Sequence, residues 1–327
     1  MRRFPPRLAR ILCLTLALCL TLCACSAVEG APSPSPQIAV SPAAGMELDI
    51  APLVEDPAVS NLLLPEASGT VVYENDAAEI DASHFDLGYI MIRRAASGEK
   101  RMKVIVTGPS TAAYTYNLSN SAEYAVFPLS DGNGTYSVGI YENAYDAKYA
   151  LVLDAKLDVK LKDEFAPFLT PNQFVNYNET TKAVLLAREL TGNMTGPIKK
   201  IETVFDYVVN GISYDYELAK TVQSGYLPDL DNVLARKKGI CFDYAALMTA
   251  MLRSLGIPTK LVVGYTGSIY HAWISTYTEE SGWVDGVIFF DGANWKMMDP
   301  TFLSAANKDD MTDYTQNAAN YQAKYLY

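Results

Sequence analysis

The sequence predicts an α+β protein in which an antiparallel, sandwich-like β domain precedes helices that pack on a second antiparallel sheet. Three observations predict this class. Short runs rich in Val, Ile and Tyr alternate with turn clusters over residues 67–165, helical periodicity begins near residue 178, and strand-like runs return after residue 258. A chain of 327 residues is also too long for one small core and suits two domains.

The N-terminus indicates export. Four arginines among the first ten residues precede an apolar run at residues 11–25. The run is shorter than the roughly 20 residues of a membrane span and matches the charged and apolar regions of a signal peptide. It ends in Leu22-Cys23-Ala24-Cys25, which resembles the bacterial lipobox. The resemblance implies that residues 1–24 are a signal peptide and that Cys25 is lipidated; an ordinary cleaved signal with incidental cysteines is the alternative.

Residues 25–66 follow as the lipidated N-terminus and a spacer. The spacer is rich in Pro, Ser and Ala and almost uncharged, which predicts an extended, disordered segment. We therefore expect an extracytoplasmic protein that is anchored to the cell membrane as a lipoprotein. The formal net charge of −11 disfavours nucleic acid or an anionic lipid surface as the main partner, so the expected membrane contact is the N-terminal lipid.

We expect residues 67–168 to form the β-rich domain. Its predicted strands lie at residues 88–94, 102–108, 112–118, 134–142 and 149–161. Nothing here indicates catalysis, because His84 has no cysteine or carboxylate cluster at metal-ligand spacing beside it and is interpreted as a structural or surface residue. The many tyrosines suit a carbohydrate-binding face, but we favour their ordinary role as strand residues.

Three helices are predicted in the second half of the chain. The first follows Asn178 or Thr180 as its cap, and the second runs from Pro197 to Gly211. The third begins at or just after Cys241 and ends before Gly256 and Pro258, with a wide apolar face between.

Cys241 is the only cysteine beyond residue 25. At a helix start, unpaired N–H groups and the positive end of the helix dipole favour a thiolate and suit an oxyanion; a buried, inert thiol is the alternative. A carboxylate at Asp243 would raise the pKa of a neighbouring thiol. We expect Asp243 instead to serve the helix N-terminus or to pair with the basic run at residues 236–238.

Strands are predicted at residues 259–267, 271–279 and 295–302. His271 opens the second of these, and Asp299 lies in the third. A thiol activated by an imidazole, whose other nitrogen is held by a third group, is what thiol acyl transfer requires. Cys241, His271 and Asp299 supply these groups in order.

Three motifs carry a resemblance to a known family: Gly239-Ile-Cys-Phe-Asp-Tyr-Ala245, His271-Ala-Trp273 and Asp299-Pro-Thr301. Over residues 170–305 the chain resembles the transglutaminase-like superfamily, a papain-like thiol fold. The resemblance implies Cys241 as nucleophile, His271 as general base and then acid, and Asp299 as the residue that orients the imidazole. The predicted fold is thus a β-sandwich-like domain followed, over residues 169–327, by a transglutaminase-like (papain-like) catalytic domain, with the catalytic Cys at a helix N-terminus packed on an antiparallel sheet.

The stretch at residues 281–295 departs from the family pattern and is interpreted as an extra hairpin or loop. Asp285 and Asp291 lie in it and are rivals of Asp299 for the third role. Two further residues are candidates near the site. Tyr214 either donates a hydrogen bond to the oxyanion or packs in the core, and Trp273 is expected to pack under His271 because it lies two residues along the same strand.

The expected function is that of a cysteine peptidase or amidase that acts on cell-wall or surface peptides through a thioester. Hydrolysis is favoured because water is always present and the sequence shows no dedicated binding site for an acceptor amine. A crosslinking transglutaminase-type acyltransferase and a non-catalytic surface-binding scaffold are the alternatives. No cofactor is expected, and two histidines with one remaining thiol offer too few soft ligands for a metal site.

Overall fold

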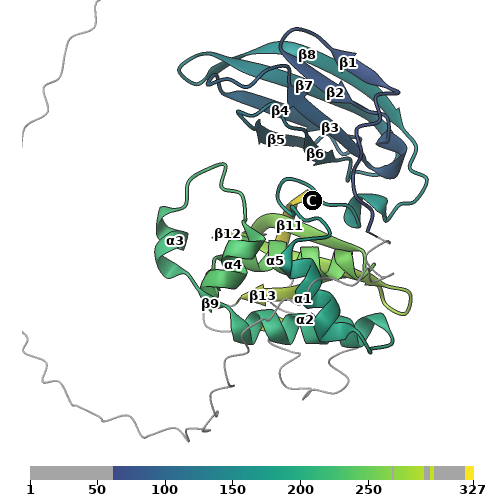
Figure 1. The fold of residues 1–327 in the computed structure, drawn as a ribbon, viewed down its shortest axis with the longest axis vertical. Coiled ribbons are helices and arrows are strands. Elements are labelled where there is room, and N and C mark those ends of the chain that lie inside the picture. Colours follow the sequence, from purple (N-terminus) through teal and green to yellow (C-terminus); the bar gives the residue numbers. More distant parts are fainter. Residues whose placement is uncertain (1–61, 267–268, 291–294, 298–320) are drawn as a thin grey trace, which may run out of the picture. The chain divides into compact units, whose positions relative to one another are not determined.

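The computed structural model describes residues 62–266, 269–290, 295–297 and 321–327 (Figure 1). The predicted signal peptide, Cys25 and most of the spacer lie outside the described residues, as do Asp291 and Asp299. All described residues belong to one compact unit of the chain.

The first half is the predicted β-sandwich, built from two four-stranded antiparallel sheets. One sheet has the order β1-β2-β3-β6, with β1 Val72–Glu74, β2 Ala78–Asp81, β3 Tyr89–Arg94 and β6 Ala125–Pro128. The other has the order β5-β4-β7-β8, with β4 Met102–Thr107, β5 Ala113–Leu118, β7 Gly134–Tyr145 and β8 Lys148–Val159. Strict alternation of buried and less buried residues in β4 and β5 gives the inner face its apolar side chains. The short strands β1, β2 and β6 were not expected from the sequence.

Five helices follow: α1 Lys182–Thr191, α2 Pro197–Gly211, α3 Tyr216–Thr221, α4 Leu230–Arg236 and α5 Cys241–Ser254. The predictions for α2 are confirmed, because Pro197 is its first residue and Gly211 its last. The prediction that α5 begins at Cys241 is also confirmed. The helices α3 and α4 were not expected.

The predicted cap of α1 is wrong. The N-cap residue is Thr181, and its side chain makes no capping bond. The side chain of Asn178 instead closes a local turn by accepting from the Thr180 N–H. The N–H of Lys182, the first residue of α1, donates to Asp231 Oδ1 at 2.9 Å. A carboxylate from α4 therefore satisfies the first N–H of α1, which the side chain of the N-cap residue does not cap.

The second half contains a five-stranded antiparallel sheet in the order β14-β13-β12-β11-β15. Its strands are β11 Thr259–Thr266, β12 Ile269–Thr278, β13 Gly282–Phe290, β14 Trp295–Met297 and β15 Tyr321–Leu326. The segment interpreted as an extra hairpin or loop thus supplies β13, which pairs with β12. Strand β15 was not expected, and its approach to β11 requires Gly264, where an added Cβ would lie 2.0 Å from a backbone oxygen of β15.

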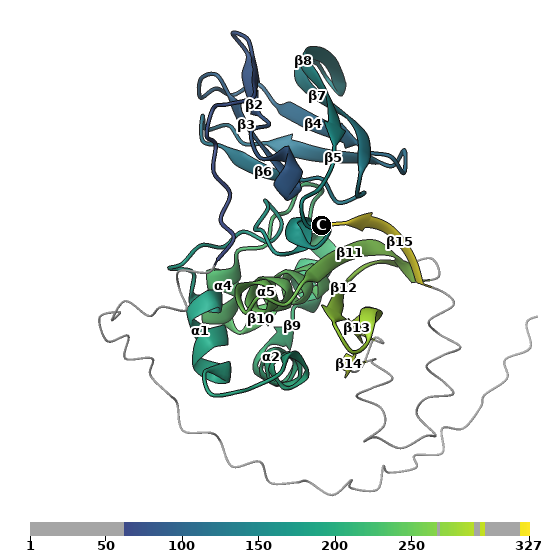
Figure 2. The ribbon, with the colours of Figure 1, turned by 90° about the vertical axis from the view of Figure 1, so that its right-hand side faces the viewer.

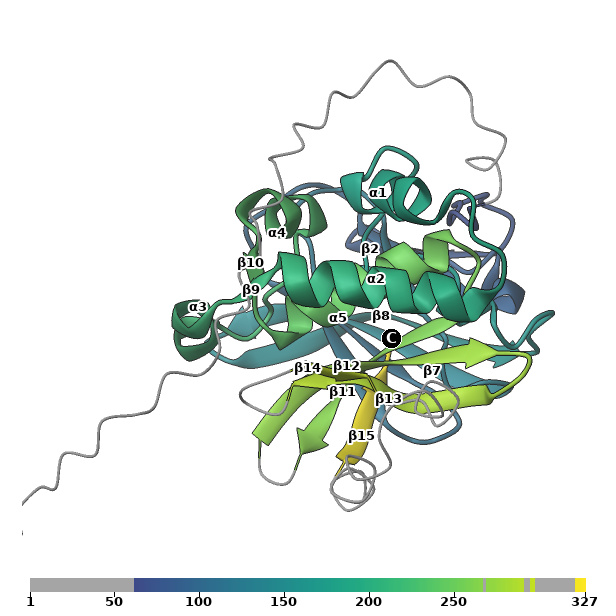
Figure 3. The same cartoon turned by 90° about the horizontal axis from the view of Figure 1, so that it is seen from below.

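Helix α5 is the central element of this half. It contacts β11 and β12 on one side and α1, α2 and α4 on the other (Figures 2 and 3). Every residue from Asp243 to Ser254 is buried, as expected of a helix covered on all sides. The candidate nucleophile, Cys241, therefore lies at the first residue of a helix whose residues from Asp243 onward are all buried.

Buried Arg253 joins distant segments near the end of α5. Its guanidinium donates to three carbonyl oxygens, those of Thr170, Thr259 and Tyr327, at 2.6 to 2.8 Å. Burial lowers the pKa of Arg253 to about 10. A two-stranded parallel ladder of β9 Ser213–Tyr214 and β10 Lys238–Gly239 completes the domain. In the described part of the chain, no helix is long and apolar enough to cross a membrane.

Candidate active site

The start of α5 is fixed by a buried carboxylate. Asp243 is fully buried, and its Oδ2 accepts from the Ile240 N–H at 2.8 Å, while its Oδ1 accepts from the Tyr226 hydroxyl at 2.7 Å. The expectation that Asp243 serves the helix N-terminus is confirmed. Gly239 lies so close that an added Cβ would meet the Asp243 Cβ at 2.7 Å. This contact gives a physical reason for glycine two residues before the thiol.

The side chain of Cys241 is partly buried and is the hydrogen-bond acceptor of three donors. They are the backbone N–H of Phe242 in α5, the backbone N–H of Ala272 in β12 and the hydroxyl of Tyr214 in β9. The donors come from three separate elements. The sulfur thus lies where the helix start, the sheet and the short ladder meet, in an environment that accommodates negative charge on sulfur.

Burial nevertheless raises the pKa of the Cys241 thiol above its usual value. The three donors act in the opposite direction, and the charge of Asp243 adds to the rise. Of the two alternatives that the sequence left open for Cys241, a thiolate at the helix start and a buried thiol, the raised pKa favours the buried thiol. Loss of solvation outweighs the donors, and the thiol is the form that the site holds.

His271 lies in β12, directly before the residue whose N–H reaches the sulfur. Burial lowers the pKa of His271 to about 4, so its resting form is neutral. Its ring stacks on Trp273, with ring centroids 6.4 Å apart and an interplanar angle of 25°, which confirms the expected contact. The histidine Nε2 is buried and has no hydrogen-bond partner among the described residues.

The third member of the predicted triad stays a prediction. Asp299 and its rival Asp291 lie outside the described residues, and only the backbone of Asp285, in β13, is described. The buried Nε2 of His271 is the kind of atom that an orienting carboxylate would satisfy. Among the residues that the structure describes, no three His, Cys, Asp or Glu side chains cluster as metal ligands would.

Tyr214 makes the most informative contact of the site. Its phenol oxygen accepts from the Cys241 backbone N–H and donates to the Cys241 sulfur. Burial, together with the charge of neighbouring Cys241, raises the pKa of Tyr214 to about 12. The ring also contacts Tyr216 and Tyr244, with centroids 4.9 and 6.4 Å away. Both features that the sequence left open are present, because the ring packs against other tyrosines and the hydroxyl contacts Cys241; the role as an oxyanion donor stays a prediction.

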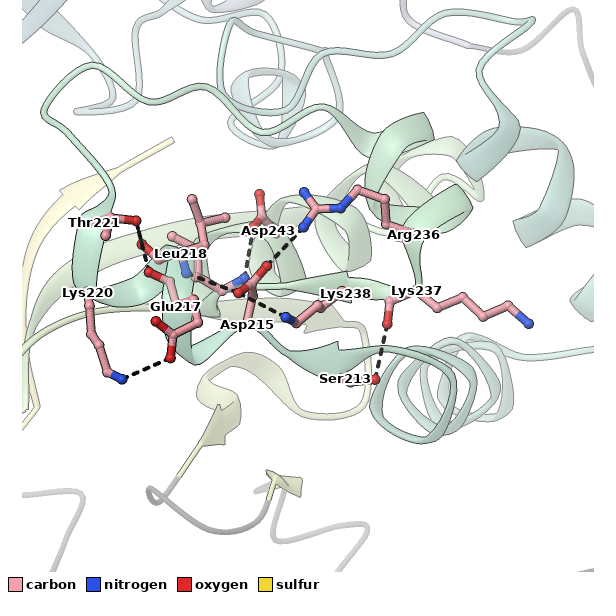
Figure 4. Close-up of polar contacts among 11 residues, drawn as sticks. Ser213, Asp215, Glu217, Leu218, Lys220, Thr221, Arg236, Lys237, Lys238 and Asp243 are labelled. Atoms are coloured by element: carbon pink, nitrogen blue, oxygen red, sulfur yellow. Dashed lines mark hydrogen bonds and ion pairs between the residues drawn. The ribbon is translucent and has the colours of Figure 1, made fainter.

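Sequence reasoning missed two carboxylate contacts near this site. Asp215, directly after Tyr214, is only 3% exposed and pairs with Arg236 and Lys238 (Figure 4). The basic run therefore faces Asp215 through two of its residues. Tyr226 holds Asp243, as described above. The sequence contained one signal for the Asp215 contacts: aspartate is a favoured helix N-cap, and Asp215 precedes a potential helix start in the segment Ser213-Tyr-Asp-Tyr-Glu217.

A family model matches the part of the chain that contains Cys241 and His271. Residues 185–286 match the family model of the transglutaminase-like superfamily. The uncharacterised protein YebA of Bacillus subtilis is 26% identical over 211 residues, covering 58% of this chain and 28% of that protein. The protein MJ1282 of Methanocaldococcus jannaschii is 34% identical over 80 residues, covering 22% of this chain and 23% of its own. The chain thus spans about a quarter of the length of these curated relatives.

Solved structures with low overall similarity include a candidate cysteine protease from Cytophaga hutchinsonii, with 16% identity, a TM-score of 0.33 and coverage of 66% of this chain and 67% of that one. Red sea bream transglutaminase has 12% identity and a TM-score of 0.26, with coverage of 65% of this chain and 48% of its own. The family model match rests on the segment that contains α5, Cys241 and His271. This chain carries a domain of the transglutaminase-like superfamily at residues 185–286.

Proposed function

We propose that this protein is a membrane-tethered, extracytoplasmic thiol hydrolase that cleaves amide or peptide bonds through a thioester on Cys241. The observation that carries the proposal is the convergence of the Phe242 N–H, the Ala272 N–H and the Tyr214 hydroxyl on one sulfur at the start of α5. Donors of this kind stabilise the negative charge that develops on sulfur and on a carbonyl oxygen during acyl transfer.

The reaction begins from the neutral pair. Cys241 transfers its proton to His271 as the sulfur attacks the substrate carbonyl, and the Cys241 N–H and the Tyr214 hydroxyl stabilise the resulting oxyanion. The C–N bond breaks as His271 gives the proton to the leaving amine, which leaves a thioester. Water, deprotonated by His271, then attacks the thioester and regenerates the thiol. Asp299 is proposed to orient the imidazole during both proton transfers.

Cell-wall and surface peptides are the proposed substrates, because they are what an anchored extracytoplasmic enzyme can reach. Cys25 is proposed as the lipidated residue that keeps the enzyme at the membrane. The proposal for both rests on the sequence of the signal and spacer. The alternatives, transfer of the acyl group to an amine and binding without turnover, are outcomes of the experiment that follows.

The test is to incubate the purified protein with peptidoglycan fragments and a labelled amine, and to identify the products by mass spectrometry. A new carboxylate product supports hydrolysis, and incorporation of the label identifies an acyltransferase. An acyl adduct on the Cys241 peptide that hydroxylamine removes supports the thioester. The Cys241→Ala variant should show neither product nor adduct. Binding of fragments without product or adduct would contradict the proposal and identify a scaffold.

A further inference from the structure

The segment that carries Tyr214 is attached to the segment that carries Cys241 by a very short ladder. The Ser213 N–H donates to the Lys237 carbonyl oxygen, and the Asp215 N–H donates to the Gly239 carbonyl oxygen, both at 2.8 Å. Parallel pairing is slightly weaker per residue than antiparallel pairing, and this ladder has only two residues on each strand. Other contacts are needed to hold the phenol against the thiol.

Asp215 supplies such contacts. Its Oδ2 accepts from the Arg236 guanidinium at 2.9 Å, and its Oδ1 lies 3.2 Å from the Lys238 ammonium (Figure 4). Oδ1 also caps α3 by accepting from the Leu218 N–H at 3.0 Å. The bond from Leu218 and the charge of Lys238 lower the pKa of Asp215 below its usual value, so this carboxylate is ionised at neutral pH.

The two cations belong to the turn that leads into the nucleophile. Arg236 ends α4, Lys238 begins β10, and Cys241 follows three residues later. Lys237 between them has a positive φ of 49°, and its side chain points away from Asp215 (Figure 4). This left-handed turn separates Lys237 from its two neighbours, whose side chains both reach one carboxylate.

We propose that Asp215 is a positioning residue, which pairs with Arg236 and Lys238 to hold the Tyr214 hydroxyl on the thiol and backbone N–H of Cys241. Asp215 follows Tyr214 in the chain, so its ion pairs join the phenol-bearing segment to the thiol-bearing turn. Without this charge, the short ladder and the ring contacts with Tyr216 and Tyr244 are left to position the phenol. A role of Asp215 in catalysis rests on the proposed function, but its role in positioning the Tyr214 hydroxyl does not.

The position of the phenol can be measured without a substrate. The rate of Cys241 alkylation by iodoacetamide follows the thiolate fraction, and its pH profile reports the pKa of the thiol. Mass spectrometry of the Cys241 peptide separates this thiol from the N-terminal cysteines. The Tyr214 hydroxyl donates to the sulfur and favours the thiolate. Tyr214→Phe should therefore move the midpoint upward and slow alkylation below the midpoint by about tenfold, relative to the high-pH plateau.

Asp215→Asn is the decisive variant, because asparagine keeps the shape of the side chain and a good helix cap but loses the charge. We expect an upward shift in the same direction as for Tyr214→Phe. The double variant should shift no further than Tyr214→Phe alone, because the charge acts through the phenol. Glu217→Gln is the matched control: it removes a carboxylate two residues away that is 79% exposed in its side chain and pairs only with Lys220 among the contacts described. Its profile should match the wild type.

Two results would overturn the proposal. In the first, Asp215→Asn lowers the thermal midpoint but leaves the alkylation profile unchanged, which identifies a purely structural carboxylate. In the second, the shifts of the two single variants add fully in the double variant. Lys238→Gln repeats the test from one of the two cationic partners of Asp215 and covers the case in which Asp215→Asn fails to fold. A wild-type protein that shows the expected coupling but no turnover would refute the proposed function and leave the role of Asp215 intact.

Discussion

Cys241 and His271 are both partly buried, and the loss of solvation acts on their pKa values in opposite directions. Burial raises the pKa of the thiol and lowers that of the imidazole to about 4, so both shifts favour the neutral pair over the ion pair. Proton transfer then has to be driven by the substrate, whose carbonyl carbon accepts the sulfur as the proton leaves. At neutral pH we therefore expect the free Cys241 thiol to react slowly with small electrophiles, because little of it is thiolate.

This electrostatic state gives the first prediction. The midpoint of Cys241 alkylation should lie above the ordinary thiol value of about 8.5, because the pKa of Cys241 is raised by burial. His271→Ala should abolish turnover but leave that midpoint near the wild-type value, because a neutral imidazole contributes no charge. The measurement is iodoacetamide labelling across pH, followed by mass spectrometry. A midpoint well below 8.5 that rises in His271→Ala would instead demonstrate a resting ion pair.

The Nε2 of His271, which has no hydrogen-bond partner among the described residues, gives the second prediction. Asp299→Asn should reduce turnover strongly, because an amide stabilises the wrong imidazole tautomer; losses of about 10⁴-fold in kcat accompany such a change in a comparable triad. Asp285→Asn and Asp291→Asn are the matched controls, with the same chemical change in the same part of the chain. Their turnover should stay near the wild type. Collapse of activity in Asp291→Asn, with Asp299→Asn unaffected, would transfer the orienting role to Asp291.

Among the elements, those with a strong local signal could be predicted from the sequence. Pro197 and Gly211 mark α2, and the glycine, thiol and apolar face mark α5. Strand β15 could not be predicted, because it joins β11 from far along the chain. The ladder of β9 and β10 is too short to leave a periodic pattern. The contact of Tyr214 with Cys241 depends on that ladder, so the sequence could only suggest it.

The start of helix α1 also depends on a residue that is distant in the sequence, Asp231, and it gives the third prediction. Asp231→Ala should destabilise the protein by about 1 kcal/mol, because it removes the carboxylate that accepts from the Lys182 N–H at the helix start. The measurement is the free energy of unfolding from urea titration. Asp231→Asn keeps an acceptor oxygen and should retain most of the stability. Equal destabilisation by both variants would show that the charge of Asp231, rather than its hydrogen bond, matters.

At the scale of the whole molecule, the proposed tether gives the fourth prediction. Cys25→Ala should release the protein from membranes or block processing of its signal, because the lipid is the only membrane signal that the sequence predicts beyond residue 24. A single acyl chain binds membranes marginally, so firm anchoring further implies more than one chain. The measurement is detergent phase partitioning of the wild type and the variant. A wild-type protein found in the aqueous phase would contradict the lipoprotein assignment.

The predicted boundary between residues 168 and 169 is crossed by side-chain contacts. Tyr116 of β5 packs against Phe174 and Tyr327, with ring centroids 5.6 and 5.9 Å apart. The Ser130 hydroxyl donates to the Leu326 carbonyl oxygen at 2.7 Å. Buried Arg253, at the end of α5, binds the Thr170 and Tyr327 carbonyl oxygens. The segment around Phe174 and the end of the chain therefore pack on both halves.

These contacts give the last prediction. A fragment that starts near residue 167 keeps Cys241, His271 and Asp299, but it uncovers the aromatic surface that Tyr116 covers, because β5 is missing. We expect this fragment to aggregate or to lose native thiol reactivity, and a protein spanning residues 62–327 to unfold in one transition when followed by circular dichroism and by Cys241 alkylation. Tyr116→Ala in that longer protein should lower its stability by about 3–5 kcal/mol, the cost of removing a large buried aromatic side chain, and should do so for both probes together. A soluble fragment with a native alkylation profile, or two separate transitions in the longer protein, would show that the catalytic half folds independently and that the aromatic contacts only join two autonomous domains.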